Sequence, residues 1–293
     1  LNTGSTNIIN KNAFVANQAV EDVQSIDISA NGQVVAFLAK TNNAFGESCV
    51  LAWDASSDVC TLVSANLTNG LPVAATCQVP RLDSQGRYVS FVSSATGLVT
   101  NSLSGNYHMY QRDLVAGTTA LLDIDENAGG WPLSSLNVPI LSEDGRFVAF
   151  ECVRSDITGS RNSDVFVLDR QTGTADLISQ HAPGLAASTA AGTSFLPSRA
   201  LSAGGRLVAF ASHAENLVPN DGNGVRDVFV RDLVAMTNLL VSINGGTNSG
   251  NGASLDPVIS ANGRYVAFSS VASDLVAGDT NTNQDVFVRD LQS

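Results

Sequence analysis

The sequence predicts an all-β fold, a five-bladed β-propeller built from four-stranded antiparallel blades. Three observations predict it. A six-residue phrase of the type Gly-Arg-Tyr-Val-Ala-Phe occurs five times in the 293 residues, and each copy follows a hairpin turn and precedes a second apolar phrase. The copies recur every 54 to 60 residues, counted between the glycines that open them: Gly32, Gly86, Gly145, Gly205 and Gly263. A repeat of this length with several short strands is typical of propeller blades.

Each unit opens with a short apolar strand that ends in a tight turn. In the last unit, Pro-Val-Ile-Ser at 257–260 is followed by Ala-Asn-Gly at 261–263. Two other units carry Asn-Gly and Asp-Gly at the same place. These dipeptides accept the positive φ angles of a two-residue hairpin, so the first and second strands are predicted to be antiparallel neighbours.

The second strand is the repeated phrase itself, which is apolar on both faces, as expected in a sheet covered on both sides. The third strand is Asp-Val-Phe-Val-Arg-Asp, found at 227–232 and 285–290 and in weaker forms in the other units. A turn and a fourth strand follow, as at 237–242. The blade repeats are therefore predicted at residues 25–64, 79–123, 138–179, 196–242 and 256–293.

The last repeat stops after its third strand. The chain begins with Thr-Asn-Ile-Ile-Asn at 6–10, which is similar to Thr-Asn-Leu-Leu-Val at 237–241. In both segments the asparagine that follows the threonine lies 25 residues ahead of the next hairpin glycine. We therefore predict that residues 5–10 supply the missing strand and close the ring, which makes residues 1–293 a single propeller domain.

Charge and hydropathy exclude several classes of partner. Lys and Arg total 15 against 27 Asp and Glu, a formal net charge of -12. A surface this negative repels phosphate, so nucleic acid and anionic membranes are excluded, whereas cations and neutral polymers such as glycans stay open. No stretch approaches the roughly 20 apolar residues that span a bilayer, so membrane insertion is not expected.

The start of the chain and its cysteines bear on its setting. The chain begins at Leu1 without an initiator Met, and we expect it to be part of a larger polypeptide. Its four cysteines form no Cys-x-x-Cys pair, so zinc and thioredoxin-like chemistry are not expected. A disulfide and a role as small buried hydrophobic residues are both open for Cys49, Cys60, Cys77 and Cys152.

The repeated phrases resemble a known repeat. Residues 260–268, followed by residues 285–291, resemble the TolB-type β-propeller repeat, a relative of the WD-type repeat. The resemblance covers essentially the whole chain and is strongest in the last three units. It implies a binding platform with no catalytic set of its own, in the periplasm, secreted or at the cell surface. TolB itself has six blades and an additional amino-terminal domain, so a role in the Tol envelope system does not transfer.

Long polar connections predict the binding surface, because function is usually carried by loops on a rigid scaffold. In a four-stranded blade, the connections between the second and third strands and those between blades emerge on one face. The long connections of this kind are residues 65–78, 123–137, 180–195 and 243–255. We expect this face to bind a protein or a glycan. Trp131 is the candidate ligand-binding residue, and packing onto its own blade is the other interpretation.

Two loops carry oxygen-bearing side chains at alternate positions, which is typical of calcium ligands. The last blade has Asp279, Asn281, Asn283 and Asp285. The fourth blade has a thinner version, Asp221, Asn223 and Asp227. Neither is an EF-hand, because the twelfth position falls within a predicted strand. Ca²⁺ is therefore the one candidate cofactor, and the alternative is that these residues only cap turns.

No catalytic residue is predicted. The repeated Asp54, Asp113, Asp169, Asp232 and Asp290 are predicted turn residues, as are the hairpin arginines Arg87, Arg146, Arg206 and Arg264. No Gly-x-Ser-x-Gly or His-Glu-x-x-His motif occurs. The alternative is a glycoside hydrolase or lyase with carboxylates at the propeller axis. Its candidates lie near first strands: Asp22, Asp27, Asp83 and Asp256.

Overall fold

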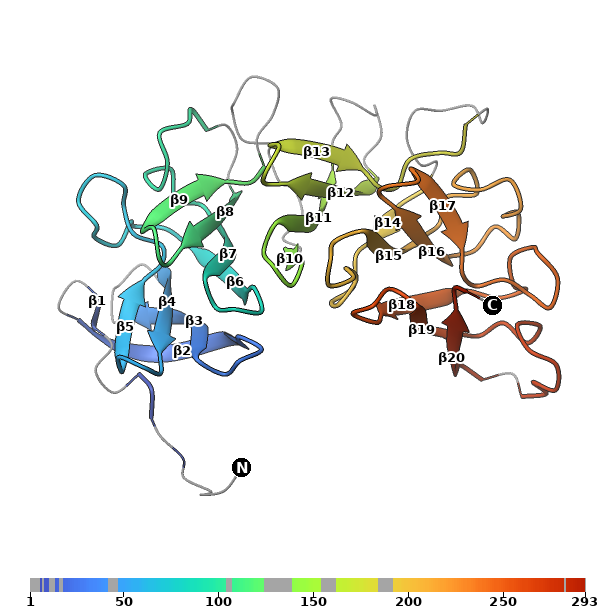
Figure 1. Ribbon diagram of the computed structural model, residues 1–293, viewed down its shortest axis with the longest axis horizontal. Helices are drawn as coiled ribbons and strands as arrows, with labels where there is room; N and C mark the ends of the chain where they lie inside the picture. The colour runs from blue at the N-terminus through green and yellow to red at the C-terminus, as the bar shows by residue number, and fades with distance from the viewer. Residues whose placement is uncertain are drawn as a thin grey trace. The chain divides into compact units, whose positions relative to one another are not determined.

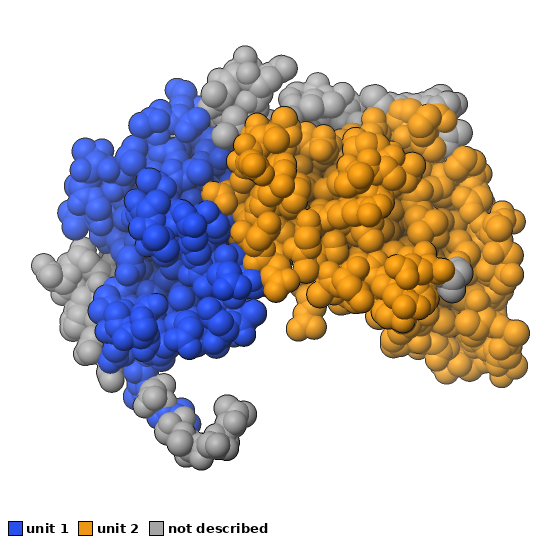
Figure 2. All heavy atoms as spheres, viewed as in Figure 1, with its two compact units in different colours: residues 1–133 blue, residues 134–293 orange. Residues whose placement is uncertain are grey.

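All regular secondary structure of the described residues is β-strand, arranged in five antiparallel sheets. The computed structural model describes residues 6, 8–10, 14–15, 18–41, 47–103, 107–123, 139–153, 162–183, 192–281 and 283–292. Within these ranges no helix is long and apolar enough to cross a membrane. The chain divides into two compact units, residues 1–133 and residues 134–293 (Figure 2).

The first unit contains two sheets (Figure 1). The first sheet has the order β1 (Phe14–Val15), β2 (Gln18–Ile28), β3 (Val34–Thr41), β4 (Ser48–Asp54) and β5 (Val59–Leu62). The second has the order β6 (Cys77–Leu82), β7 (Tyr88–Ser93), β8 (His108–Asp113) and β9 (Thr118–Leu121). The β1–β2 hairpin is an addition that the repeat did not predict, because among the described residues the first repeat alone has a strand ahead of its blade.

The second unit contains three sheets. The first comprises β10 (Ile140–Leu141), β11 (Phe147–Val153), β12 (Ser163–Asp169) and β13 (Thr174–Leu177). The next comprises β14 (Ser194–Phe195), β15 (Leu207–Ser212), β16 (Asp227–Asp232) and β17 (Thr237–Leu240). The last has three strands, β18 (Ser254–Ile259), β19 (Tyr265–Ser270) and β20 (Asp285–Asp290).

The hairpin between the first and second strand forms for the predicted reason. Gly263 has a φ of 73°, a left-handed conformation that glycine adopts without strain. Ser260 caps this turn, since its hydroxyl accepts a hydrogen bond from the Tyr265 N–H at 2.9 Å. Serine has the same role in three other sequence repeats, where it is Ser29, Ser142 and Ser202. The β6–β9 sheet uses Asp83 instead, which accepts from the Tyr88 N–H at 2.8 Å.

Adjacent sheets of the second unit pack face against face. One face of the β14–β17 sheet stacks Phe210 on Phe229, with ring centroids 5.6 Å apart. The opposite face carries Val228 and Val230, which pack in one cluster with Val266 of the last sheet. Both faces of β16 are therefore buried. β15, the second strand, is also buried on both faces, as its two-sided apolar pattern predicted, since Ala209 lies in the cluster with Val266 and Phe210 stacks on Phe229. The all-β fold of repeated antiparallel sheets is confirmed.

Closure of the ring by residues 5–10 is not confirmed. Among the described residues of the last sheet, β20 has no fourth strand beside it. Of the predicted closing segment, residues 6 and 8–10 are described, and they form no strand. The Ile9 carbonyl instead accepts a hydrogen bond from the Cys60 thiol, with the sulfur 3.6 Å away, and Ile9 packs beside the first sheet.

The cysteines are free thiols, which decides between the two interpretations left open by the sequence. Cys49, Cys77 and Cys152 are buried, and Cys60 is half-buried. Burial raises the pKa of Cys49 to about 12, so this thiol stays protonated at neutral pH. The buried cysteines act as small hydrophobic residues.

Candidate functional site

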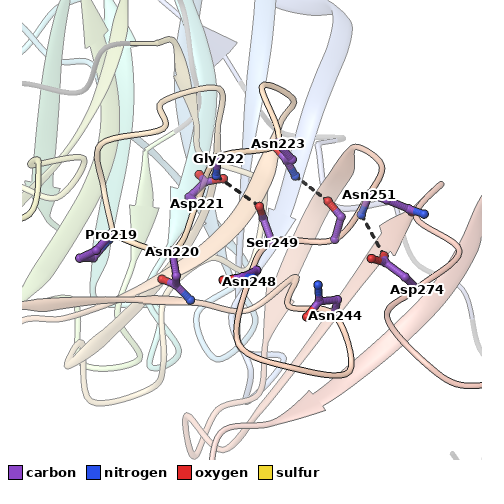
Figure 3. Close-up of a pocket in the computed structure, with 11 residues that line it drawn as sticks. Pro219, Asn220, Asp221, Gly222, Asn223, Asn244, Asn248, Ser249, Asn251 and Asp274 are labelled. Atoms are coloured by element: carbon purple, nitrogen blue, oxygen red, sulfur yellow. Dashed lines mark hydrogen bonds between the residues drawn. The ribbon is translucent and has the colours of Figure 1, made fainter.

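Three loops of the second unit surround a polar pocket of about 460 Å³, which we call the loop pocket (Figure 3). The β15–β16 loop contributes residues 219–223, and the β17–β18 loop contributes residues between 244 and 251. Asp274 is supplied by the β19–β20 loop. The sequence predicted that connections of these two kinds share a face, and the loop pocket brings them together. Its polar lining residues are Asn220, Asp221, Asn223, Asn244, Asn248, Ser249, Asn251 and Asp274.

The β17–β18 loop is held by contacts within itself and to its neighbour. Ile243 and Ser249 form an isolated antiparallel bridge. The Asn251 N–H donates to the Asp274 carboxylate at 2.9 Å, an interaction visible in Figure 3. Gly252 lies so close to the Ala272 backbone that a Cβ would come within 2.8 Å of the Ala272 nitrogen. These contacts fix the pocket wall before any ligand arrives.

Asn223 joins the two loops of the β14–β17 side of the pocket. Its Oδ1 accepts from the Val225 N–H at 2.9 Å, which makes a local turn. Its Nδ2 donates to the Asp227 carboxylate at 2.6 Å and to the Gly250 carbonyl at 2.7 Å. The Asn223 side-chain oxygen is thus used within its own loop, and its amide nitrogen ties that loop to the next one.

Two buried carboxylates lie next to each other beneath this loop. Asp227 is fully buried and accepts a 2.5 Å hydrogen bond from the Ser242 hydroxyl. Burial raises the pKa of Asp227 to about 7, and the neighbouring Asp221 carboxylate adds to the shift. Burial also raises the pKa of Asp221, which is only 8% exposed. Asp221 Oδ1 is buried with no hydrogen-bond partner among the described residues. Such a pair can hold a proton or a cation.

An aspartate–serine pair like Asp227–Ser242 occurs at the equivalent position of another sheet. In the preceding sheet, the Ser179 hydroxyl donates to Asp164 at 2.8 Å. The β6–β9 sheet has a variation that the sequence did not reveal, since His108 Nδ1 lies 2.8 Å from the Asp123 carboxylate and both are buried. Because the aspartate–serine pair recurs, Asp227 has a structural role in addition to any role at the pocket.

The loop of the last blade repeats this arrangement in part. Asn281 Nδ2 donates to the Asp285 carboxylate at 2.9 Å, and Asn281 Oδ1 accepts from the Asn283 N–H at 2.7 Å. Asp279 Oδ1 is buried with no hydrogen-bond partner in the described part of the chain, as Asp221 Oδ1 is. Within that part, no group of three or more His, Cys, Asp or Glu side chains is placed to hold a metal ion.

Trp131 lies outside the described residues, as do most of the 123–137 connection and residues 184–191 of the 180–195 connection. The 65–78 and 243–255 connections are described in full. Among the described residues of the four long connections, only those of 243–255 line the loop pocket.

The carboxylates proposed for an enzyme are largely engaged. Asp27 accepts from the Leu82 N–H at 2.8 Å and so joins the two sheets of the first unit. Asp83 caps its hairpin, as described above. Asp22 accepts from the Gln24 amide at 2.7 Å and lies 3.9 Å from the Lys40 ammonium. Asp256 sits at a β-bulge with a φ of 50°. None of the four lines the loop pocket.

The repeated arginines and aspartates are turn residues, as predicted, and they also pair. The Asp232 carboxylate accepts from the Val234 and Ala235 N–H groups and binds the Arg206 guanidinium at 2.6 Å. The hydrogen bonds from Arg206 lower the pKa of Asp232 to about 2. The pair recurs as Arg87–Asp113, Arg146–Asp169 and Arg264–Asp290.

Several pocket residues were not predicted individually. Asn244 and Asn248 fall in a connection that the sequence marked as long and polar, but nothing distinguished them from their neighbours. Asn220 precedes the predicted calcium loop by one residue. Asp274 carried no signal, because it reaches the pocket only when the loops of two consecutive blades lie side by side.

Solved structures define the class of protein. The β-propeller domain of the Trilobed protease from Pyrococcus furiosus, described as having an open velcro topology, matches with a TM-score of 0.55 and 8% identity, over 94% of this chain and 70% of that chain. An oligogalacturonate lyase in complex with manganese matches with a TM-score of 0.53 and 9% identity, over 95% of this chain and 68% of that chain. The repeated sheets and these matches show a β-propeller fold.

TolB is also among the structural neighbours. TolB from Acinetobacter baumannii matches with a TM-score of 0.44 and 15% identity, over 87% of this chain. The chain spans 53% of the length of that TolB. No protein-family model and no curated protein matches the sequence.

Proposed function

We propose that the chain is a non-catalytic binding propeller of an exported protein, with the loop pocket as its binding site and a glycan as its ligand. The observation that carries this proposal is the lining of the pocket, which consists of amide, hydroxyl and carboxylate groups on loops held by hydrogen bonds. The exported setting, periplasmic, secreted or at the cell surface, is part of the proposal and is supported by the TolB-type resemblance.

The lining favours a ligand rich in hydroxyl groups. Most small-molecule pockets of about 300–1,000 Å³ are lined predominantly by apolar side chains. The loop pocket is within that size range, yet Pro219 is its one apolar side chain among the described residues. Asparagine amides both donate and accept hydrogen bonds, which suits the hydroxyls of a neutral polysaccharide. A protein partner is the other outcome that a binding screen can give.

The test is a glycan array followed by calorimetric titration of the best hit. Asn248 is exposed and its side chain has no structural hydrogen bond in the described part of the chain, so Asn248→Ala should weaken binding about fivefold or more without a change in Tm. Gln171→Ala, an exposed substitution in the β12–β13 turn, is the matched control and should bind normally. No hit on the array, or equal binding by Asn248→Ala, would reject the pocket as the glycan site.

A glycoside hydrolase or lyase is the second candidate function. Asp221 and Asp274 both line the pocket, and paired carboxylates are the groups such reactions use. Asp227, the neighbour of Asp221, pairs with Ser242 as Asp164 pairs with Ser179 in the preceding sheet. This recurrence favours a structural role for Asp227 over a catalytic one. Release of reducing ends or of unsaturated products from a bound glycan would establish the enzyme and reject the binding module.

We also propose that the five sheets form one ring, with residues 5–10 as the fourth strand beside β20. Val286 and Val288 are 80% and 66% exposed, whereas the equivalent Val228 and Val230 are 0% and 3% exposed. In the β14–β17 sheet this face is covered by the neighbouring sheet, so the exposed valines indicate that a further sheet packs here. Among the described residues β20 also has no strand on its outer edge, and such an edge is a site for strand addition. Deletion of residues 1–12 should therefore lower the Tm by several degrees, and an unchanged melting curve would argue against this closure.

A further inference from the structure

We propose that the β15–β16 loop binds a calcium ion between the carboxylates of Asp221 and Asp227, next to the loop pocket. The inference does not depend on which ligand the pocket takes. It begins with an oxygen that the fold leaves unsatisfied. Asp221 is 8% exposed, it lines the pocket, and its Oδ1 has no hydrogen-bond partner among the described residues. An unsatisfied carboxylate oxygen is costly to bury, and native structures normally provide it with a partner.

The charges around Asp221 identify the kind of partner that is needed. The Asp227 carboxylate interacts directly with that of Asp221, and Glu215 adds a further negative charge nearby. Neither Asp221 nor Asp227 forms an ion pair with Lys, Arg or His within the described ranges. Buried carboxylates are stable when they are paired with a positive charge or coordinate a metal. The site therefore brings two carboxyl groups into contact, and neither has an ion-pair partner among the described residues.

The donor set selects a hard cation. The groups at hand are carboxylates, the Ser249 hydroxyl, which interacts with Asp221, and the Gly250 carbonyl, which faces the same loop. Ca²⁺ accepts carboxylate, hydroxyl, carbonyl and water oxygens in flexible numbers, whereas zinc prefers nitrogen and sulfur ligands. Three acidic ligands are not required, since carbonyl oxygens and water complete many calcium sites.

The arrangement occurs twice, which makes a chance gap in the hydrogen bonding a poor explanation. Asp279 is separated from Asn281 and Asp285 by the same spacing as Asp221 from Asn223 and Asp227. In both loops the asparagine amide donates to the last aspartate, and Oδ1 of the first aspartate is buried without a partner in the described part of the chain. In the last blade Asp285 is only half-buried. The fourth-blade loop is therefore the primary site.

The experiment is a titration of EDTA-treated full-length protein with CaCl₂, followed by calorimetry and by the Tm. The wild type should release heat with a Kd at or below about 1 mM and should melt several degrees higher with saturating Ca²⁺. Asp221→Asn keeps the shape and removes the charge, so binding should weaken tenfold or more. Without Ca²⁺ this variant should melt no lower than the wild type, because a repulsion is removed.

Two further variants complete the design. Asp144→Asn is the matched control, because asparagine already occupies this hairpin position in two other repeats, as Asn31 and Asn262. This variant should bind Ca²⁺ as the wild type does. Asp279→Asn should retain the fourth-blade site. Absence of heat and of a Tm shift in the wild type would overturn the proposal. It would also be overturned by full binding in Asp221→Asn, or by loss of binding in Asp279→Asn alone. Glycan binding is measured separately, so its failure leaves this result intact.

Discussion

Substitution of Val288 by alanine distinguishes a closed ring from an open one. The side chain is 66% exposed on β20, and its equivalent on β16, Val230, is 3% exposed. Each buried methylene contributes about 0.8 kcal/mol, so Val230→Ala should cost about 2 kcal/mol once the residual cavity is added. Val288→Ala should cost about 0.5 kcal/mol if the ring is open and this face stays exposed. It should cost about 2 kcal/mol if the ring is closed, because a neighbouring sheet then covers this face as the last sheet covers Val230.

The assay is urea unfolding of both variants, in the full chain and in a chain that lacks residues 1–12. This cycle cancels the change in strand propensity that any Val→Ala substitution causes. At about 2–4 °C per kcal/mol, the two outcomes for Val288→Ala correspond to a Tm loss of about 1–2 °C or about 4–8 °C. Val230→Ala should cost the same in both backgrounds. If Val288→Ala costs about 0.5 kcal/mol in both as well, closure by the amino-terminal strand is refuted.

Three other outcomes follow from single contacts. The Arg206 guanidinium lowers the pKa of Asp232 to about 2. The pair therefore stabilises the fold fully above the unfolded pKa of 3.8, and this stabilisation is lost as the pH falls from about 4 to 2. Arg206→Gln should flatten that part of the stability–pH curve, and an unchanged curve below pH 4 would contradict the prediction. Gly205→Ala should lower the urea midpoint more than Gly173→Ala does. Both glycines have a φ near 72°, but of the two only Gly205 is placed so that an added Cβ would overlap a side chain, the Phe147 ring. Equal costs would show that backbone strain at positive φ accounts for the whole effect. Asp83→Ser should raise the free energy of unfolding at pH 7 by up to about 1 kcal/mol. Burial raises the pKa of Asp83, so its charged form is unfavourable in the fold, and four other hairpins use serine at this position. A lower urea midpoint would show that the carboxylate is required.

The repeat made the strands predictable, because local patterns determine them. Asn-Gly turns, two-sided apolar second strands and the Asp-Val-Phe-Val phrase each predict local structure, and the sheets follow in that order. The β1–β2 hairpin escaped prediction because it belongs to no repeat. Closure escaped confirmation because it depends on pairing between the two ends of the chain, for which the sequence offers one short similarity.

The candidate site was predictable in composition and not in detail. Asp221, Asn223 and Asp227 were recognised by spacing alone, and the structure adds that the asparagine serves the loop while Asp221 is left with an unsatisfied oxygen. The His108–Asp123 pair could not be predicted, because its members are 15 residues apart, His108 at the start of β8 and Asp123 beyond the end of β9. They replace the Asp–Ser pair of other repeats, with the carboxylate on the later residue. The replacement of an Asp–Ser pair by a His–Asp pair is recognised only when the side-chain positions of the sheets are compared.

The Arg–Asp pairs have a consequence for engineering. They hold the hairpin and the third strand together at one end of four sheets, whereas the loop pocket lies at the end where the repeated pairs do not reach. Foreign peptides grafted into the β17–β18 connection would therefore leave all four Arg–Asp pairs in place. The scaffold separates the part that can be redesigned for new specificity from the part that must be preserved.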